Sequence, residues 1–224
     1  MKECAKMQEQ FHLPIIFDLG ATFIFGITGA LAALQRGYDF IGLFALAFAS
    51  GVGGGLLRDG LFIQQGPPAV TMDSRYIVAI TLASLVGLLF RHGVTRLTKV
   101  IALVDALGLG AYAVVGIEKS INAGLSIPAA ILVGVINAVG GGLLRDLLVR
   151  DEPLLLKPGQ FYALAALGGC LLFIFLTMRF GMPAPRAAVI TIACTFVVRV
   201  LAITFNWRTK PLYSPDTSEE EQKR

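Results

Sequence analysis

Charged side chains are scarce in this sequence, and their scarcity limits the class of protein it can be. Asp, Glu, Lys and Arg make up 15% of the 224 residues, whereas apolar residues make up 55%. A soluble domain carries about a quarter charged residues because it needs a polar surface. The charges here also fall between long apolar runs, as loops alternate with membrane spans. The sequence therefore predicts an integral membrane protein whose outer partner is lipid.

Residues that catalyse reactions or hold metals are also few. The chain has two histidines, His12 and His92, and three cysteines without a CxxC pair. They offer little material for a metal site, a catalytic triad or a disulfide framework. The glycine-rich segment Gly51–Asp59 lacks the GK[ST] ending of a phosphate-binding loop. We therefore expect no enzyme activity, no metal and no cofactor.

Basic residues exceed acidic ones, giving a net charge of +4, but they do not indicate a nucleic-acid partner. No cluster of Lys and Arg is combined with aromatic side chains, as a nucleic-acid surface requires. The basic residues instead lie at the ends of apolar runs and mark topology. A slight excess on the face that carries the C-terminus favours a multi-pass cell-membrane protein with an external N-terminus and a cytoplasmic C-terminus.

Seven apolar stretches predict an all-α protein with seven transmembrane helices. A span needs about 20 mostly apolar residues. The third stretch is the shortest, and borrowing from either flank would lengthen it. The predicted spans are Leu13–Leu34, Phe40–Leu57, Tyr76–Phe90, Val100–Ile117, Leu125–Leu144, Phe161–Met178 and Pro185–Phe205.

The chain contains a copy of itself. Residues 53–59 read GGGLLRD, and residues 140–146 read GGGLLRD again, at an offset of 87. The same offset aligns Asp18 with Asp105 and Gly37 with Gly124 without a gap. A chance match would not extend over so long a segment, so the sequence predicts a duplication.

Each copy holds three spans, an odd number, so the second copy must cross the membrane upside down. Inverted repeats are an architecture of transporters and channels, with the solute site at the repeat interface near mid-membrane. The predicted organisation is an N-terminal segment (1–12), repeat 1 (13–92), repeat 2 (93–180), a seventh span (181–207) and a polar C-terminal tail (208–224).

The triple glycines allow two interpretations, which are compatible. Small residues let helices approach closely. Glycine runs also bend or unwind helices, and backbone freed at membrane depth is tolerated where it lines a cavity, with carbonyl oxygens available to cations. The residues concerned are Gly53, Gly54, Gly55, Gly140, Gly141 and Gly142.

The Arg and Asp that close each motif are either interfacial charges or buried pathway residues. Arg58 and Asp59, like Arg145 and Asp146, are followed by more apolar residues, which favours burial. Ionisable groups inside a membrane usually mark a pathway or a paired site. Because adjacent residues on a helix point apart, we expect each to find a partner on another helix.

Other charged residues are weaker candidates. Asp18 and Asp105 are equivalent by the offset, and each is either a helix cap or a carboxylate facing a pathway. Lys119 has an apolar counterpart, Ala32, so it is either a gating charge or a lysine that snorkels to the interface. Arg199, late in the seventh span, is expected to anchor the cytoplasmic end.

Two uncharged polar residues accompany the glycines. Ser50 and Asn137 are equivalent by the offset, and each lies three residues before its triple glycine. Side chains in this position would line the same path as the glycines. We therefore add both to the candidate pathway.

Two copies of a glycine-triplet-plus-Arg-Asp motif, in three-span repeats followed by a seventh helix, resemble the prokaryotic members of the trimeric intracellular cation channel family, which overlaps with a glycine-transporter-type domain family. The resemblance covers roughly Phe11 to Trp207. It implies a prokaryotic plasma or inner membrane protein that forms a homotrimer, with a pore in each protomer. It also implies permeation by potassium and sodium, and kinks at the glycines of the second and fifth spans. Carried over by motif, the pore-lining residues are Gly53, Gly54, Gly55, Arg58 and Asp59 with Gly140, Gly141, Gly142, Arg145 and Asp146.

The leading hypothesis for function is a monovalent cation channel, with potassium as the expected ion. The alternative is a secondary transporter of a small zwitterion such as glycine, in which a half-helix N-terminus would hold the carboxylate. A third class, a non-transporting scaffold, predicts packed glycines without a cavity. The first two share one architecture, so the sequence does not separate them.

Overall fold

The computed structural model describes residues 10–89, 97–157 and 161–207, and within them the chain is helical and has no strand. The polar tail expected over 208–224 lies outside these residues, as do most of the N-terminal segment and the expected boundary between residues 92 and 93. The elements are α2 (Ile16–Gln35), α3 (Phe40–Leu57), the π-helical η1 (Arg58–Ile63), α4 (Ala69–Met72), α5 (Arg75–Leu89), α6 (Leu97–Asn122), α7 (Ile127–Leu148), α8 (Tyr162–Phe180) and α9 (Ala184–Thr204).

Among these residues, six helices are long and apolar enough to cross a membrane, and a seventh apolar helix is shorter. The short one is α5, where the sequence also predicts the shortest span. Its 15 residues measure about 22 Å at 1.5 Å per residue, less than the hydrocarbon core of about 30 Å. The other predicted spans match helices whose ends differ by a few residues.

The largest boundary difference is at the end of α6, which continues five residues past the predicted end at Ile117. Its last turns are polar, and Asn122 donates a side-chain hydrogen bond to Glu118 at 2.7 Å, one helical turn away. Lys119 therefore lies within the helix and not in a loop.

Glycine and proline set several helix ends. Gly37 and Gly124, which are equivalent by the offset of 87, follow α2 and α6 with φ of 68° and 85°. Only glycine adopts this left-handed backbone without strain, so the same turn recurs in both copies. Pro128 and Pro185 occupy first-turn positions of α7 and α9, where a missing N–H costs nothing.

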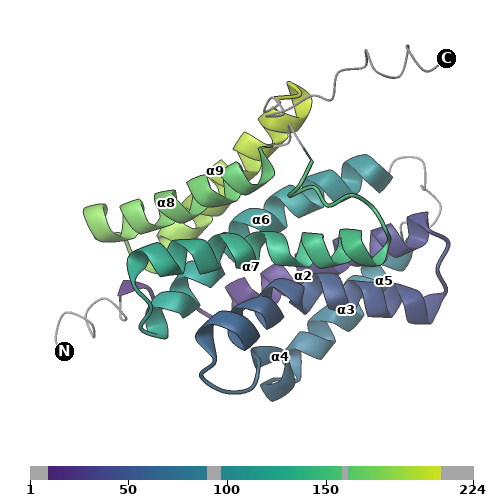
Figure 1. The fold of residues 1–224 in the computed structure, drawn as a ribbon, viewed down its shortest axis with the longest axis horizontal. Coiled ribbons are helices and arrows are strands. Elements are labelled where there is room, and N and C mark those ends of the chain that lie inside the picture. The colour runs from purple at the N-terminus through teal and green to yellow at the C-terminus, as the bar shows by residue number, and fades with distance from the viewer. Residues whose placement is uncertain (1–9, 90–96, 158–160, 208–224) are drawn as a thin grey trace, which may run out of the picture.

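By their contacts, the apolar helices form two three-helix groups and one additional helix. Figure 1 shows how they are arranged in space. α2 packs on α3 and α5, while α6 packs on α7 and α8. The groups meet where α3 contacts α7 and α2 contacts α6, and α9 packs on α6 and α8. α6 is the most buried span, so it forms the axis of the bundle. Large apolar side chains are exposed along α5 and α9, as a lipid-facing surface requires.

The triple glycines lie where α3 and α7 cross. A methyl group on Gly54 would overlap the backbone oxygen of Asn137. One on Gly141 would overlap the backbone oxygen of Ser50. Later residues of α3 thus meet earlier residues of α7, which requires the two helices to run antiparallel.

The expected unwinding at the glycines does not occur in this structure. α3 is α-helical through Leu57, and α7 is α-helical through Leu148. Backbone oxygens at the crossing remain within their helices, because the glycines are used for close packing. The helical pattern changes after the glycines, where η1 begins at Arg58.

We predict that Gly54→Ala lowers the thermal stability of the purified protein. The added methyl would force α3 away from α7, at a cost of about 1–3 kcal/mol. The matched control is Gly168→Ala in α8, where an added methyl meets nothing within 4 Å. That change should stabilise its helix by up to about 1 kcal/mol. Thermal unfolding in detergent measures both, and equal melting temperatures for the two variants would contradict the close crossing.

Candidate functional site

Arg58 is buried at the end of α3, where it is held by neighbours on two helices. Its Nε donates to Asp59 Oδ1 at 2.7 Å, and its Nη2 donates to Asp59 Oδ2 at 3.1 Å. Its Nη1 donates to Asn137 Oδ1 of α7 at 3.4 Å. The side chain is 1% exposed. Arg58 is therefore a buried charge and not an interfacial one.

Arg145 repeats this arrangement at the end of α7 and is 3% exposed. Its Nε donates to Asp146 Oδ1 at 2.9 Å, and its Nη1 donates to Asp105 Oδ1 of α6 at 2.9 Å. Both arginines have the expected partner on another helix, whereas Asp146 bonds to Arg145 and to a backbone N–H outside the helices. The expectation that adjacent Arg and Asp cannot meet is wrong, because the long arginine side chain turns its guanidinium back towards its neighbour.

The aspartate of each motif also fixes where the chain leaves its helix. The Asp59 carbonyl accepts from Gln64 N at 2.9 Å, and the Asp146 carbonyl accepts from Asp151 N at 2.9 Å. Both bonds span five residues, so the same wide turn follows both motifs. The carboxylates then accept from the backbone of the returning chain, at Ala69 N (3.2 Å) and Leu154 N (3.1 Å) respectively.

Asp18 joins the two groups of helices. Its Oδ2 lies 2.8 Å from Lys119 Nζ of α6, and it accepts a hydrogen bond from the Tyr76 hydroxyl at 2.6 Å. It also attracts Arg58. The cap interpretation of Asp18 and Asp105 is wrong, because Ile15 is the N-cap of α2 and Asp105 lies inside α6. Both carboxylates instead face basic side chains. The snorkelling interpretation of Lys119 is also wrong in this structure, because its ammonium turns inward to Asp18.

Arg199 is not the outward-facing anchor that the sequence analysis expects. It is 1% exposed and lies over the Tyr162 ring, with Cζ 4.9 Å from the ring centroid. The sequence does contain a signal for this burial, namely the position of Arg199 within a predicted apolar span. A single arginine there is costly unless it has partners.

Between the two arginine clusters, aromatic and polar side chains close the interior. Phe25 and Tyr112, which are equivalent by the offset, stack with ring centroids 5.2 Å apart. The Tyr112 hydroxyl donates to the Gly51 carbonyl and hydrogen-bonds Thr22 at 2.9 Å. Asn137 donates to the Tyr112 carbonyl at 2.6 Å. We call Phe25, Tyr112 and the α3–α7 glycines the central seal.

Ser50 and Asn137 are fully buried beside the central seal. Ser50 pairs with the Thr28 hydroxyl at 3.1 Å. Both candidates therefore lie at the crossing as expected, but they border other side chains and not a hollow. Their role in lining a path stays a prediction.

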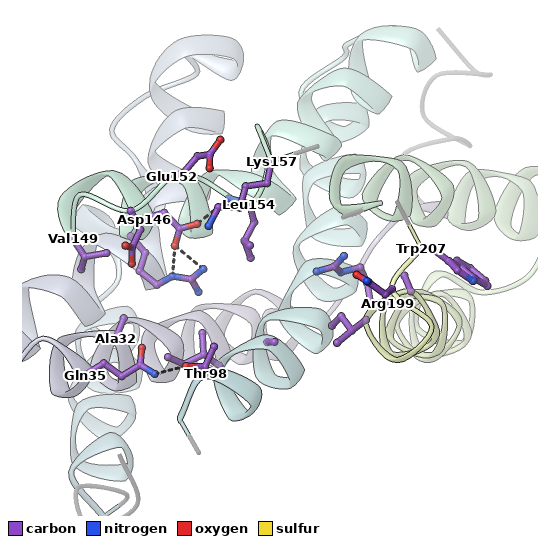
Figure 2. Close-up of a pocket in the computed structure, with 17 residues that line it drawn as sticks. Ala32, Gln35, Thr98, Asp146, Val149, Glu152, Leu154, Lys157, Arg199 and Trp207 are labelled. Atoms are coloured by element: carbon purple, nitrogen blue, oxygen red, sulfur yellow. Dashed lines mark hydrogen bonds and ion pairs between the residues drawn. The ribbon is translucent and has the colours of Figure 1, made fainter. Parts of the chain in front are cut away.

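One cavity, of about 270 Å³, opens beside the Arg145 cluster (Figure 2). Figure 2 shows Asp146 and Lys157 on one side, Arg199 and Trp207 on another, and Gln35 hydrogen-bonded to Thr98 below. Basic and acidic side chains both contribute to its wall. We call this the Arg145-side cavity.

A second cavity, of about 290 Å³, is lined by Asp59, Lys119 and the loop at residues 63–67. We call it the Asp59-side cavity. It shares Asp59 and Ala69 with a space of about 10 Å³ that extends inward to Arg58 and Tyr112. A space of this size holds about one water molecule. The Asp59-side cavity therefore narrows inward and ends at the central seal.

The two cavities lie at opposite ends of α6. Thr98 borders the Arg145-side cavity, and Lys119 borders the Asp59-side cavity. At 1.5 Å per residue these positions are roughly 30 Å apart, about the thickness of the hydrocarbon core. The structure thus has a hollow at each end and the central seal between them.

Comparison with protein families matches the chain twice. A family model described as glycine transporter matches residues 15–92 and 102–178. The two matches begin 87 residues apart, the offset of the GGGLLRD repeat, and α9 lies outside both.

Similar curated proteins come from several bacteria. The UPF0126 inner membrane protein YadS of Escherichia coli K12 is 30% identical over 201 residues, which cover 89% of this chain and 95% of that one. A UPF0126 membrane protein of Deinococcus radiodurans is 32% identical over 153 residues, covering 68% and 71%.

Solved structures of similar fold are channels. A trimeric intracellular cation channel orthologue from Rhodobacter sphaeroides has a TM-score of 0.79 at 32% identity, covering 85% of this chain and 97% of that one. A structure described as the basis for conductance through TRIC cation channels has a TM-score of 0.77 at 30% identity, covering 92% and 100%.

We predict that Asp105→Ala destabilises the protein strongly. Arg145 would lose one of its two carboxylates while staying buried, at a cost of roughly 3 kcal/mol. The control is Asp151→Ala, which removes an exposed ion pair with Arg36. Exposed pairs contribute little, so its melting temperature should match the wild type. Equal melting temperatures for all three proteins would show that Arg145 does not depend on Asp105.

Proposed function

The chain belongs to the family that the glycine transporter model describes and shares the fold of prokaryotic trimeric intracellular cation channels, and we propose that it is itself a cation channel. One observation carries the proposal: a hollow lies at each end of α6, and from the Asp59-side cavity a narrow space extends inward to Tyr112 of the central seal. A chain that only served as a scaffold would gain nothing from two such hollows.

The proposed path runs through each protomer, between two inverted repeats. It enters beside Arg145 and Asp146, passes the α3–α7 crossing, and leaves beside Arg58 and Asp59. The antiparallel crossing supports inversion, because it directs the two motifs to opposite ends. The other candidate residues then lie along this path. They are the duplicated pairs Asp18 and Asp105, Ser50 and Asn137, together with Lys119.

Potassium is the proposed permeant ion, and the proposed assembly is a homotrimer in a prokaryotic inner membrane with a cytoplasmic C-terminus. Each buried arginine is matched by carboxylates, so neither end presents a net positive barrier to cations. The carboxylates Asp59 and Asp146 also border the two cavities. Oxygen ligands at both entrances suit a hard monovalent cation.

The structure corresponds to a closed state in this proposal. Conduction requires the Phe25–Tyr112 pair to separate or the α3–α7 crossing to loosen. The Tyr112 hydroxyl holds the closed arrangement through its bonds to Gly51 and Thr22. In a closed state the glycines are packed at the crossing. The same glycines can still allow α3 and α7 to move apart when the channel opens.

A secondary transporter of a small zwitterion such as glycine is the second candidate. The family description favours it, and so does the Arg145-side cavity, whose wall holds both arginines and carboxylates. A cavity of about 270 Å³ has room for an amino acid. In this case α3 and α7 would open one cavity at a time.

Planar-bilayer recording with purified protein separates the two candidates. A channel gives unitary currents that reverse at the potassium equilibrium potential. A glycine transporter gives saturable glycine uptake into proteoliposomes without unitary currents, and this result would replace the channel proposal.

We predict that Tyr112→Phe raises open probability. The ring can still stack on Phe25, but both hydrogen bonds of the hydroxyl are lost, and each contributes about 1 kcal/mol to the closed state. The open-to-closed ratio should therefore rise by roughly tenfold or more. Tyr38→Phe, on an exposed residue, is the control and should gate like the wild type. Unchanged gating in Tyr112→Phe would show that the hydroxyl does not stabilise the closed state.

A further inference from the structure

The seventh helix, α9, contributes a charge to the candidate site although it belongs to neither repeat. The family matches end at residue 178, and α9 begins at Ala184. Its Arg199 nevertheless borders the Arg145-side cavity together with Arg145 and Asp146. A helix that only filled space against lipid would not need a buried guanidinium, because burying that charge is costly.

The charge clusters at the two ends of the molecule each contain a second basic side chain, and it comes from a different source at each end. At one end, Asp18 is paired with Lys119 of α6. The duplication does not supply this charge to Asp105, because the counterpart of Lys119 is Ala32. Arg199 of α9 takes its place. It lies over the Tyr162 ring, and a methyl group on Gly142 would meet both the Tyr162 hydroxyl and Asp105 Oδ1, at 2.7 and 3.3 Å. Each end thereby acquires two acids and two bases.

Asp105 shows why this extra charge matters. Its Oδ1 accepts from Arg145, but its fully buried Oδ2 has no hydrogen-bond partner among the residues that the structure describes. A carboxylate oxygen in this position needs positive charge nearby. Either a fixed side chain supplies that charge, or a cation from the cavity does. Arg199, on the wall of the Arg145-side cavity, is a fixed positive charge of this kind.

We propose that Arg199 is a specificity-determining charge of the Arg145-side cavity. It keeps this mouth electrically balanced and thereby limits the local concentration of cations, which a fixed positive charge repels. The proposal rests on the proposed function, because it treats the cavity as one mouth of a cation pathway. It assigns α9 a part in conduction, not only in packing.

The test is Arg199→Gln in planar bilayers at about 0.05 M KCl, with protein added from one side so that all variants insert alike. Current entering through the Arg145-side mouth should rise by on the order of twofold, which makes the current–voltage relation asymmetric. At about 1 M KCl the asymmetry should vanish, because the screening length falls to roughly 3 Å.

Three further variants make the result specific. Lys119→Gln should produce asymmetry of the opposite sign, because Lys119 borders the opposite cavity. Arg199→Lys keeps the charge and should conduct like the wild type. Arg186→Gln removes a charge of the same helix at an exposed position, away from the cavity, and is the matched control.

A lower melting temperature with an unchanged current ratio in Arg199→Gln would make Arg199 a packing residue and overturn the proposal. If that variant does not fold, the double variant Arg199→Gln with Asp105→Asn removes both charges together. Its current ratio should match the wild type, and strong asymmetry there would also overturn the proposal. Absence of unitary currents in the wild-type protein would instead contradict the proposed channel.

Discussion

Two buried arginines constrain the rest of this structure. A guanidinium inside an apolar bundle is tolerated only when carboxylates and amide oxygens surround it. Arg58 and Arg145 meet this requirement with the adjacent aspartate of the motif and with a partner from a second helix. Each arginine therefore ties its own helix to another one. Arg58 joins the two three-helix groups through Asn137 of α7, whereas Arg145 joins α7 to α6 within the second group.

The motif aspartates extend this constraint to the loops. Asp59 and Asp146 each neutralise an arginine and also accept from the backbone of the chain that returns after the turn. Their carboxylates thus fix the loop at the rim of each cavity. A single pair of adjacent residues, used twice, determines a charge cluster, a helix end and a cavity wall at each end of the molecule.

Duplication explains the similarity of the two ends, and departures from it explain their differences. Phe25 and Tyr112 are counterparts, but only the tyrosine carries the hydroxyl that bonds to Gly51. Lys119 has no charged counterpart, and Arg199 comes from a helix outside the repeat. In the proposed channel, a cation would therefore meet different fixed charges on entering from the two sides, although the two sides share one duplicated motif.

The sequence by itself determined the membrane class, the apolar helices and the duplication, because these depend on local composition and on identity at a fixed offset. It also identified the charged residues of the two buried clusters, since Asp18, Asp105 and both Arg–Asp pairs stand out in apolar surroundings. It did not determine how the glycines are used. Close helix packing and helix unwinding both favour a run of glycines, so the sequence pattern is the same for both. Only the close antiparallel contact of α3 with α7 distinguishes them.

The pairing of the charges was likewise decided by tertiary structure. Arg145 and Asp105 are 40 residues apart in the chain, and no spacing rule links them. The turn of Lys119 towards Asp18 depends on how α2 lies against α6. Sequence patterns report which side of a helix is apolar, whereas the partner of a buried charge depends on which helix is packed beside it.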